Sequence, residues 1–154
     1  MHNNLVCYLF TKFDELNSIK EFIKHYKKHP SGSKHTLLIC YKLLDIEDII
    51  SLRKILGKIK YKEFIDPITV NDYDFGSYKR VSQRYKSHII LFLNSHSYPL
   101  KKNWLRKIRY HYKEKTIIGY LLELTPQFFL FFFFFQAEDG IRDFCLSRGL
   151  GLRG

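Results

Sequence analysis

The sequence predicts an α/β fold with a mainly parallel sheet and flanking helices. Short continuous apolar runs recur at residues 5–10, 37–41 and 88–93. Such runs are typical of parallel strands that are covered on both faces. The segments between them carry apolar residues at helical spacing. Strand and helix therefore alternate, as they do in sheets built from right-handed crossover connections.

The first half of the chain contains two strand–helix units. Residues 5–10 form the first expected strand, and Asp14 is the expected N-cap of a helix that ends before the turn-forming cluster at residues 29–33. The apolar stripe of this helix is Leu16, Ile19, Phe22, Ile23 and Tyr26. Residues 37–41 form the second strand, and Asp45 caps a second helix. The apolar residues of that helix are Ile46, Ile49, Ile50, Leu56 and Ile59.

The second half continues the alternation. Residues 61–65 form a weaker third strand, residues 77–86 a short third helix, and residues 88–93 a strong fourth strand. A fourth helix follows Pro99, and a fifth strand begins at residues 116–120. The expected buried side of the fourth helix is Leu100, Trp104, Leu105, Ile108 and Tyr112.

Composition limits the class of protein. The chain has 154 residues, of which 45% are hydrophobic, so it is long enough for one domain and is not a disordered tail. Its three cysteines lack metal-ligand spacing, which argues against a disulfide scaffold or a zinc module. No signal peptide opens the sequence, so we expect a cytoplasmic protein. The net charge of +11 indicates anionic partners such as phosphates, nucleic acid or anionic lipid.

The composition changes abruptly near Gln127. Residues 128–135 are Phe apart from one Leu and show neither helical nor strand periodicity, so we expect no amphipathic helix and no half-buried strand there. Residues 136–143 resemble the translation of a primer used to build short-read sequencing libraries, and residues 147–151 resemble its adaptor. We therefore separate a domain at residues 1–122 from a low-complexity run with an artefactual tail at residues 123–154. The alternative is a hydrophobic C-terminal anchor with a polar end.

Ligands of parallel α/β sheets bind beyond the carboxyl ends of the strands. Thr11 follows the first predicted strand. Two further segments are unusually polar beside their apolar flanks: residues 71–78, which lead into the third helix, and residues 94–99, which follow the fourth strand. We expect these segments to meet in one cleft.

Two stretches resemble a known family. They are Asn71-x-x-Asp74-x-Gly76-Ser77-Tyr78-Lys79 and Ile89-Ile90-Leu91-Phe92-Leu93-Asn94-Ser95-His96-Ser97. With the order of elements, they are similar to the nucleotide-binding half of GT-A glycosyltransferases of the family 2 type over residues 3–120. The resemblance implies a truncated, Rossmann-like GT-A domain. It also implies transfer of a sugar from a nucleotide-sugar donor to a glycan or lipid-linked acceptor in cell-surface polysaccharide synthesis, at the inner face of a membrane.

The resemblance also implies a donor-binding site made of Thr11, Asp74, Gly76, Asn94 and His96. Members of the family hold Mg²⁺ or Mn²⁺ with an Asp-x-Asp motif after the fourth strand, to neutralise the donor diphosphate. Here Asn94-Ser95-His96 stands at that place, so no metal ligand is assigned.

Each of these residues also has a purely structural interpretation. Asp72 and Asp74 fit turns and helix caps, as well as contact of Asp74 with the donor. Gly76 either admits a phosphate to a helix N-terminus or permits a turn. His96 contacts phosphate, binds a metal weakly, or lies in a solvated loop.

The basic residues offer an alternative function. Lysines and arginines at residues 79–86 and 101–115 are interleaved with Tyr and Trp, which is compatible with a nucleic-acid- or membrane-binding module without catalysis. They carry no nucleic-acid-binding motif, and a solvated polar face in a Lys- and Ile-rich composition is the favoured explanation. A peripheral membrane contact is the alternative, and nucleic acid is not an expected partner. In the family the acceptor site and the general base follow the fifth strand, so we expect this chain to be an inactive fragment, and no catalytic residue is assigned.

Overall fold

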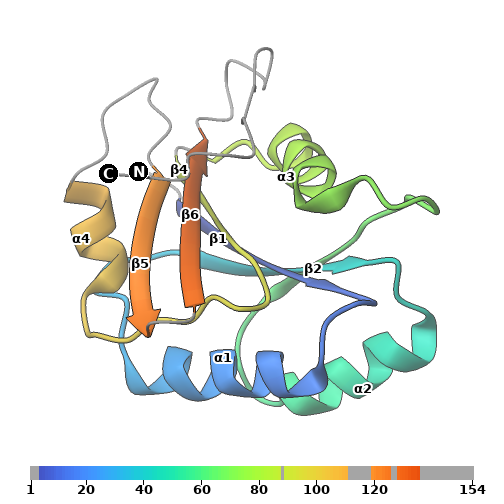
Figure 1. Cartoon of the computed structure of the whole chain (residues 1–154), viewed down its shortest axis with the longest axis horizontal. Coiled ribbons are helices and arrows are strands. Elements are labelled where there is room, and N and C mark those ends of the chain that lie inside the picture. Colours follow the sequence, from blue (N-terminus) through green and yellow to red (C-terminus); the bar gives the residue numbers. More distant parts are fainter. Residues whose placement is uncertain (1–3, 88, 111–118, 126–127, 136–154) are drawn as a thin grey trace.

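The computed structural model describes residues 4–87, 89–110, 119–125 and 128–135. They form one sheet in the order β3-β2-β1-β4-β6-β5, with helices on both faces (Figure 1). The strands are β1 (Asn4–Thr11), β2 (Thr36–Lys42), β3 (Lys62–Ile65), β4 (Ile89–Leu93), β5 (Gly119–Thr125) and β6 (Phe128–Phe135). The helices are α1 (Leu16–Lys28), α2 (Ile46–Leu56), α3 (Tyr73–Arg84) and α4 (Trp104–Tyr110).

The first four strands are parallel, which confirms the predicted fold class. β1 lies between β2 and β4, with Tyr8 opposite both Ile39 and Leu93. β3 pairs with the outer side of β2. Each strand is followed by a helix, so the carboxyl ends of all four strands lie at one edge of the sheet. This carboxyl edge is where the candidate site must be sought.

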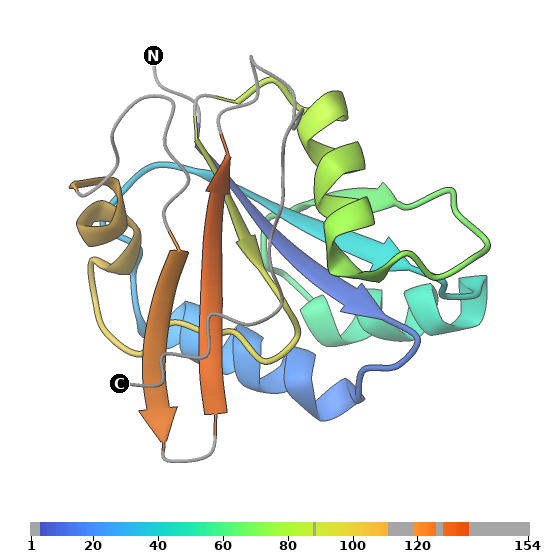
Figure 2. The same ribbon diagram turned by 45° about the horizontal axis from the view of Figure 1, so that its top comes forward.

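Helices cover both faces of the parallel strands. Figure 2 shows α1 and α2 on one side of the sheet and α3 on the other. Side chains alternate along β1: Val6 and Tyr8 belong to the core cluster under α1, α2 and α4, whereas Cys7 and Leu9 pack towards α3. Because both faces are buried, the strands read as continuous apolar runs rather than as alternating ones.

Three helices differ in detail from the sequence-based expectation. The N-cap of α1 is Glu15, because Asp14 accepts a hydrogen bond from the Thr11 backbone instead. In α2, Ile46 and Ile50 are 59% and 44% exposed, and Leu52 is buried together with the predicted Ile49 and Leu56. The helix α3 starts at Tyr73 rather than at residue 77, so Asp74 lies in its first turn and not in the preceding loop.

The phenylalanine run forms a strand, although the sequence pattern predicts none there. β6 pairs antiparallel with β4, with Leu91 opposite Phe134, and β5 pairs with β6 on its other side. A uniformly apolar run lacks a period of two, yet it suits a strand inside a sheet with both faces covered. The fifth expected strand is β5, while Tyr112 and residues 136–154, for which an artefactual tail was predicted, lie outside the described residues. Within the part of the chain that the structure describes, no helix is long and apolar enough to cross a bilayer.

Candidate functional site

The ends of β1 and β4 are joined by buried and half-buried hydrogen bonds. The Ser95 hydroxyl donates to Asp14 Oδ1 at 2.6 Å, and the Tyr8 hydroxyl donates to the Ser95 carbonyl oxygen at 3.1 Å. The backbone N–H of Thr11 donates to Asp14 Oδ2 at 2.7 Å. Both oxygens of the Asp14 carboxylate are therefore used to hold residues 11–14 beside residues 94–97. These two loops make one continuous part of the carboxyl edge.

Asn94 shapes the loop after β4 rather than presenting its oxygen to a ligand. Asn94 Oδ1 accepts hydrogen bonds from the His96 backbone N–H at 3.1 Å and from the Ser97 hydroxyl at 2.8 Å. The Asn94 carbonyl oxygen accepts a third from the Ser97 backbone N–H at 3.0 Å. This closed turn exposes the His96 side chain to solvent at the edge of the sheet.

Asp74 faces the same region from the first turn of α3. Its side chain is half-buried, and this burial raises the pKa of its carboxyl group; the negative charge of Asp14 raises it further. Lys42 and His96 act in the opposite direction on the same carboxyl group. The Lys42 ammonium group donates to the Tyr73 carbonyl oxygen, and the Lys12 backbone N–H donates to the Lys42 carbonyl oxygen at 3.1 Å, so the start of α3 is linked through Lys42 to the loop after β1. Three segments far apart in the sequence converge here.

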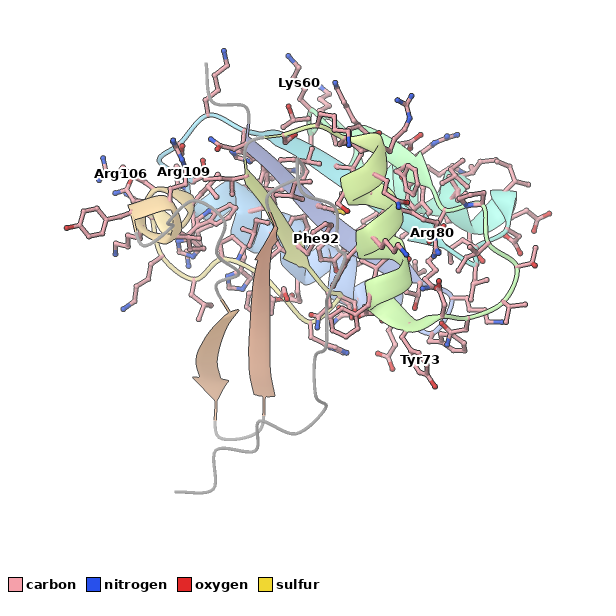
Figure 3. The ribbon with its side chains drawn as sticks, turned by 90° about the horizontal axis from the view of Figure 1, so that it is seen from above. Lys60, Tyr73, Arg80, Phe92, Arg106 and Arg109 are labelled. Carbon is pink, nitrogen blue, oxygen red and sulfur yellow. The ribbon has the colours of Figure 1, made fainter. Side chains whose placement is uncertain are left out.

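A second group of charges fixes the segment between β3 and α3. The Lys42 side chain is 1% exposed, and its ammonium group donates to Asp72 Oδ1 at 2.7 Å and to the Tyr73 carbonyl oxygen. Arg80 donates to Asp72 Oδ2 at 2.7 Å. Hydrogen bonds from Arg80 and then from Lys42 hold the pKa of Asp72 well below its usual range. Figure 3 shows Tyr73 at the start of α3 and Arg80 further along the helix.

The buried end of this network is Asp66. Its carboxylate accepts from Arg80 Nε at 2.6 Å, from Arg80 Nη2 at 2.8 Å and from the Ser77 hydroxyl at 2.6 Å. Asp66 is 4% exposed, so its charge is compensated by the two-pronged contact with the Arg80 guanidinium. The network thereby ties β2, the β3–α3 loop and α3 together and positions Asp74.

Gly76 makes room for Asp72. It lies within α3 rather than in a turn, and a Cβ atom at this position would overlap the Asp72 carboxylate. Both sequence-based interpretations of Gly76 therefore miss its nearest neighbour. No sequence spacing predicts that Gly76 and Asp72 meet. The Asp72 side chain makes no capping hydrogen bond to α3, and its carboxylate lies where a Cβ atom of residue 76 would be.

Five residues of the site region carry no predicted role in binding: Asp14, Lys42, Asp66, Arg80 and Ser95. Lys42 could have been identified from the sequence, because it is a charged residue at the end of an otherwise apolar strand. The Arg80–Asp66 pair spans 14 positions of loop and helix and follows no helical or strand periodicity. Only the folded chain reveals it.

The donor set does not fit a tight magnesium or manganese site. In the described ranges, no three His, Cys, Asp or Glu side chains are grouped so as to hold a metal ion. Both oxygens of Asp14 accept hydrogen bonds, as does Asn94 Oδ1. Hard divalent cations require several oxygen ligands at once.

Comparison with solved structures identifies the fold. A protein named as a nucleotide-diphospho-sugar transferase from Desulfovibrio desulfuricans G20 matches with a TM-score of 0.56 and 11% identity, over 92% of this chain and 70% of that one. The S. aureus TarS fragment 1–349, solved in complex with UDP-GlcNAc, matches with a TM-score of 0.47 and 13% identity, over 71% of this chain and 30% of its own. The chain thus spans less than a third of that TarS fragment. No protein-family model matches the chain, and no curated protein matches it in sequence. The property shared with the Desulfovibrio protein is a Rossmann-like α/β fold.

Proposed function

We propose that this chain is the donor-binding part of a glycosyltransferase that transfers a sugar from a nucleotide sugar to a glycan or lipid-linked acceptor in cell-surface polysaccharide synthesis. The observation that carries the proposal is the convergence of three loops, marked by Asp14, Asp74 and His96, at the carboxyl edge of a parallel sheet. The fold shared with a nucleotide-diphospho-sugar transferase supports it.

In this proposal the Asp74 carboxylate and backbone groups of the carboxyl edge bind the nucleoside and the sugar of the donor. Asp74 accepts hydrogen bonds from hydroxyl groups of the donor, a role that suits a half-buried carboxylate with only partial charge compensation. Thr11 and Asn94 shape the loops on either side. Gly76 acts indirectly, because it keeps Asp72 in place beneath α3.

The donor leaves as a nucleoside diphosphate, whose developing charge needs compensation in the transition state. His96 is an exposed imidazole in the loop after β4, and its charge acts on the Asp74 carboxyl group. We assign the contact with the diphosphate to His96. No step is assigned to a metal ion, because the described side chains offer no suitable ligand set.

No general base is assigned, and we propose that the chain binds a donor without transferring its sugar. In the family that the sequence resembles, the acceptor site and the base come from residues beyond the fifth strand. Here that region is the stretch at residues 123–154, which we attribute to a low-complexity run and a translated adaptor. A turnover assay with the purified chain should therefore give no product with any donor.

Calorimetric titration tests donor binding directly. The purified chain is titrated with uridine, guanosine and thymidine diphosphate sugars, each in EDTA and in Mg²⁺. We expect one nucleotide class to bind with the same Kd in both buffers. Asp74→Asn should weaken this binding by about tenfold, the loss of one charge-assisted hydrogen bond. Glu47→Gln, a matched change at an exposed helix N-terminus, should leave the Kd within about twofold. Absence of binding for every donor would refute the proposal.

A further inference from the structure

The charges of the molecule are segregated along the direction of the strands. In residues 4–110, the described carboxylates apart from Glu21 and Glu63 all follow the carboxyl ends of β1, β2 and β3. The exposed cations gather in the segments that lead into the strands. Part of this pattern matches the helix dipoles, since α2 and α3 carry acidic residues in their first turns and basic residues in their last turns.

The basic side is formed by several elements together. We name it the amino edge and define it by six exposed cations that precede strands or lie on and beside α4. They are Lys28, Lys34, Lys60, Lys86, Lys102 and Arg106. Figure 3 shows Lys60 and Arg106 on the side where the strands begin and Tyr73 on the side where they end.

Hydrogen bonds attach the start of α4 to this edge. The Asn103 backbone N–H donates to the Pro30 carbonyl oxygen at 2.8 Å, and the Leu105 N–H donates to the Ser31 carbonyl oxygen at 3.1 Å. The proximity has an electrostatic consequence. Burial lowers the pKa of His29, and the charges of Lys28, His25 and Lys102 lower it further. The cations of α1 and those beside α4 therefore form one surface.

This surface lacks internal neutralisation. Outside the candidate site, the ion pairs of the described residues join Arg53 to Glu63 and join Lys24 and His25 to Glu21. They leave Lys28, Lys60 and Lys102 without a carboxylate partner among the described side chains. The carboxylates of the candidate site lie at the opposite edge. The positive charge of the protein is thus concentrated away from the proposed donor site.

We propose that the amino edge is a docking surface for an anionic lipid bilayer. Its cations are mostly lysines on separate loops, which suits diffuse attraction to a charged plane. Proteins that bind single-stranded nucleic acid combine cations with aromatic platforms on which the bases stack. Of the large exposed aromatic side chains of the described residues, Phe13, Tyr73 and Phe75 lie at the carboxyl edge, and Tyr110 on α4 is a single one beside the amino edge. A bilayer therefore fits this surface better than a single-stranded nucleic acid does.

The proposal fixes the orientation of the protein. A chain held by its amino edge turns its carboxyl edge, with Asp74 and His96, away from the bilayer. Substrates then reach the candidate site from solution. The docking surface and the donor site share no residue, so each can be removed without the other.

Vesicle binding tests the surface independently of any nucleotide. The full chain is sedimented with vesicles of phosphatidylcholine alone and of phosphatidylcholine mixed with phosphatidylglycerol, at low and at high salt. We expect binding to the mixed vesicles only, lost at high salt. The triple change Lys28→Gln, Lys60→Gln and Lys102→Gln should lower the partition coefficient by about a hundredfold, roughly fivefold for each charge.

A matched triple change distinguishes an effect of the amino edge from an effect of the net charge of the protein. Lys12→Gln, Lys20→Gln and Lys79→Gln remove the same charge from exposed positions outside the amino edge and should alter binding by less than about fivefold, the effect of a single charge. Circular dichroism checks that both variants stay folded. Equal losses in the two triple variants would contradict the proposal. So would a protein that ignores the mixed vesicles but binds single-stranded RNA through Lys28, Lys60 and Lys102.

Discussion

Ser95 and Asp14 are 81 positions apart in the chain, yet the Ser95 hydroxyl lies 2.6 Å from Asp14 Oδ1. The bond joins the loop after β4 to the loop after β1, because these two strands are neighbours in the sheet. Ser95 is buried, so water does not replace the donor if the hydroxyl is removed. The geometry of the candidate site depends on this contact.

Ser95→Ala should lower the free energy of unfolding by about 1.5–3 kcal/mol, the range for a hydrogen bond to a charged partner. It should also weaken donor binding, since the two loops lose their connection. Urea unfolding and calorimetric titration measure the two effects. Ser51→Ala, at an exposed position of α2, provides the control and should change neither. A Ser95→Ala protein as stable as the parent would show that the contact contributes nothing.

Asp74→Asn should stabilise the protein at neutral pH. Burial and the charge of Asp14 raise the pKa of Asp74 above its unfolded value of 3.8, so ionisation of this group opposes folding. The neutral form stabilises the fold at low pH, and this contribution is lost as the pH rises through the raised pKa. The gain from Asp74→Asn should therefore be absent near about pH 3 and grow towards about pH 7.

Urea unfolding at a series of pH values measures this gain, with Glu47→Gln as the matched exposed control. The same substitution should weaken donor binding, so stability and function change in opposite directions. A loss of stability at neutral pH would contradict the account of the Asp74 environment.

Gly76→Ala should destabilise the protein, although alanine is the better helix former by about 1 kcal/mol. The new methyl group would overlap the Asp72 carboxylate, and overpacking of this kind costs about 1–3 kcal/mol. In a chain that already carries Asp72→Ala, the overlap is gone and the same substitution should be stabilising. A double-mutant cycle measured by urea unfolding gives the coupling. Identical effects of Gly76→Ala in the two backgrounds would disprove the steric explanation.

The two partners of the Lys42–Asp72 ion pair should respond unequally to removal. Asp72→Ala leaves the almost fully buried ammonium group of Lys42 without its carboxylate and should cost about 3 kcal/mol. Lys42→Met should stay within about 1 kcal/mol of the parent, because Asp72 is 41% exposed and keeps Arg80 as a partner. Thermal and urea unfolding compare the two. A larger loss of stability for Lys42→Met than for Asp72→Ala would contradict the account that Lys42 carries the buried charge of the pair.

The parallel core could be predicted from sequence because its strands are buried on both faces. Residues 5–10, 37–41 and 89–93 are uniformly apolar, which is the pattern that such burial imposes. Residues 128–135 are equally apolar, but a run that is Phe apart from Leu130 has no alternation and was interpreted as low complexity, so β6 was not predicted. Its pairing partner, β4, is a long-range property of the fold.

Helix boundaries were harder to predict where polar side chains have two uses. Asp14 is a good N-cap residue by type, but in the structure its carboxylate bonds to Thr11 and Ser95. Asp72 precedes α3 without capping it, since Lys42 and Arg80 bind its oxygens. These partners come from other elements, so only tertiary structure decides between the two uses.

The central claim is that one site at the carboxyl edge binds a nucleotide sugar. Titration of the ¹⁵N-labelled protein with uridine, guanosine and thymidine diphosphate sugars, followed by amide chemical shifts, tests it most directly. The account predicts that the largest shifts fall together at residues 11–14, 72–76 and 94–97. Shifts confined to the amino edge around Lys28, Lys60 and Lys102, or no shifts with any donor, would contradict it.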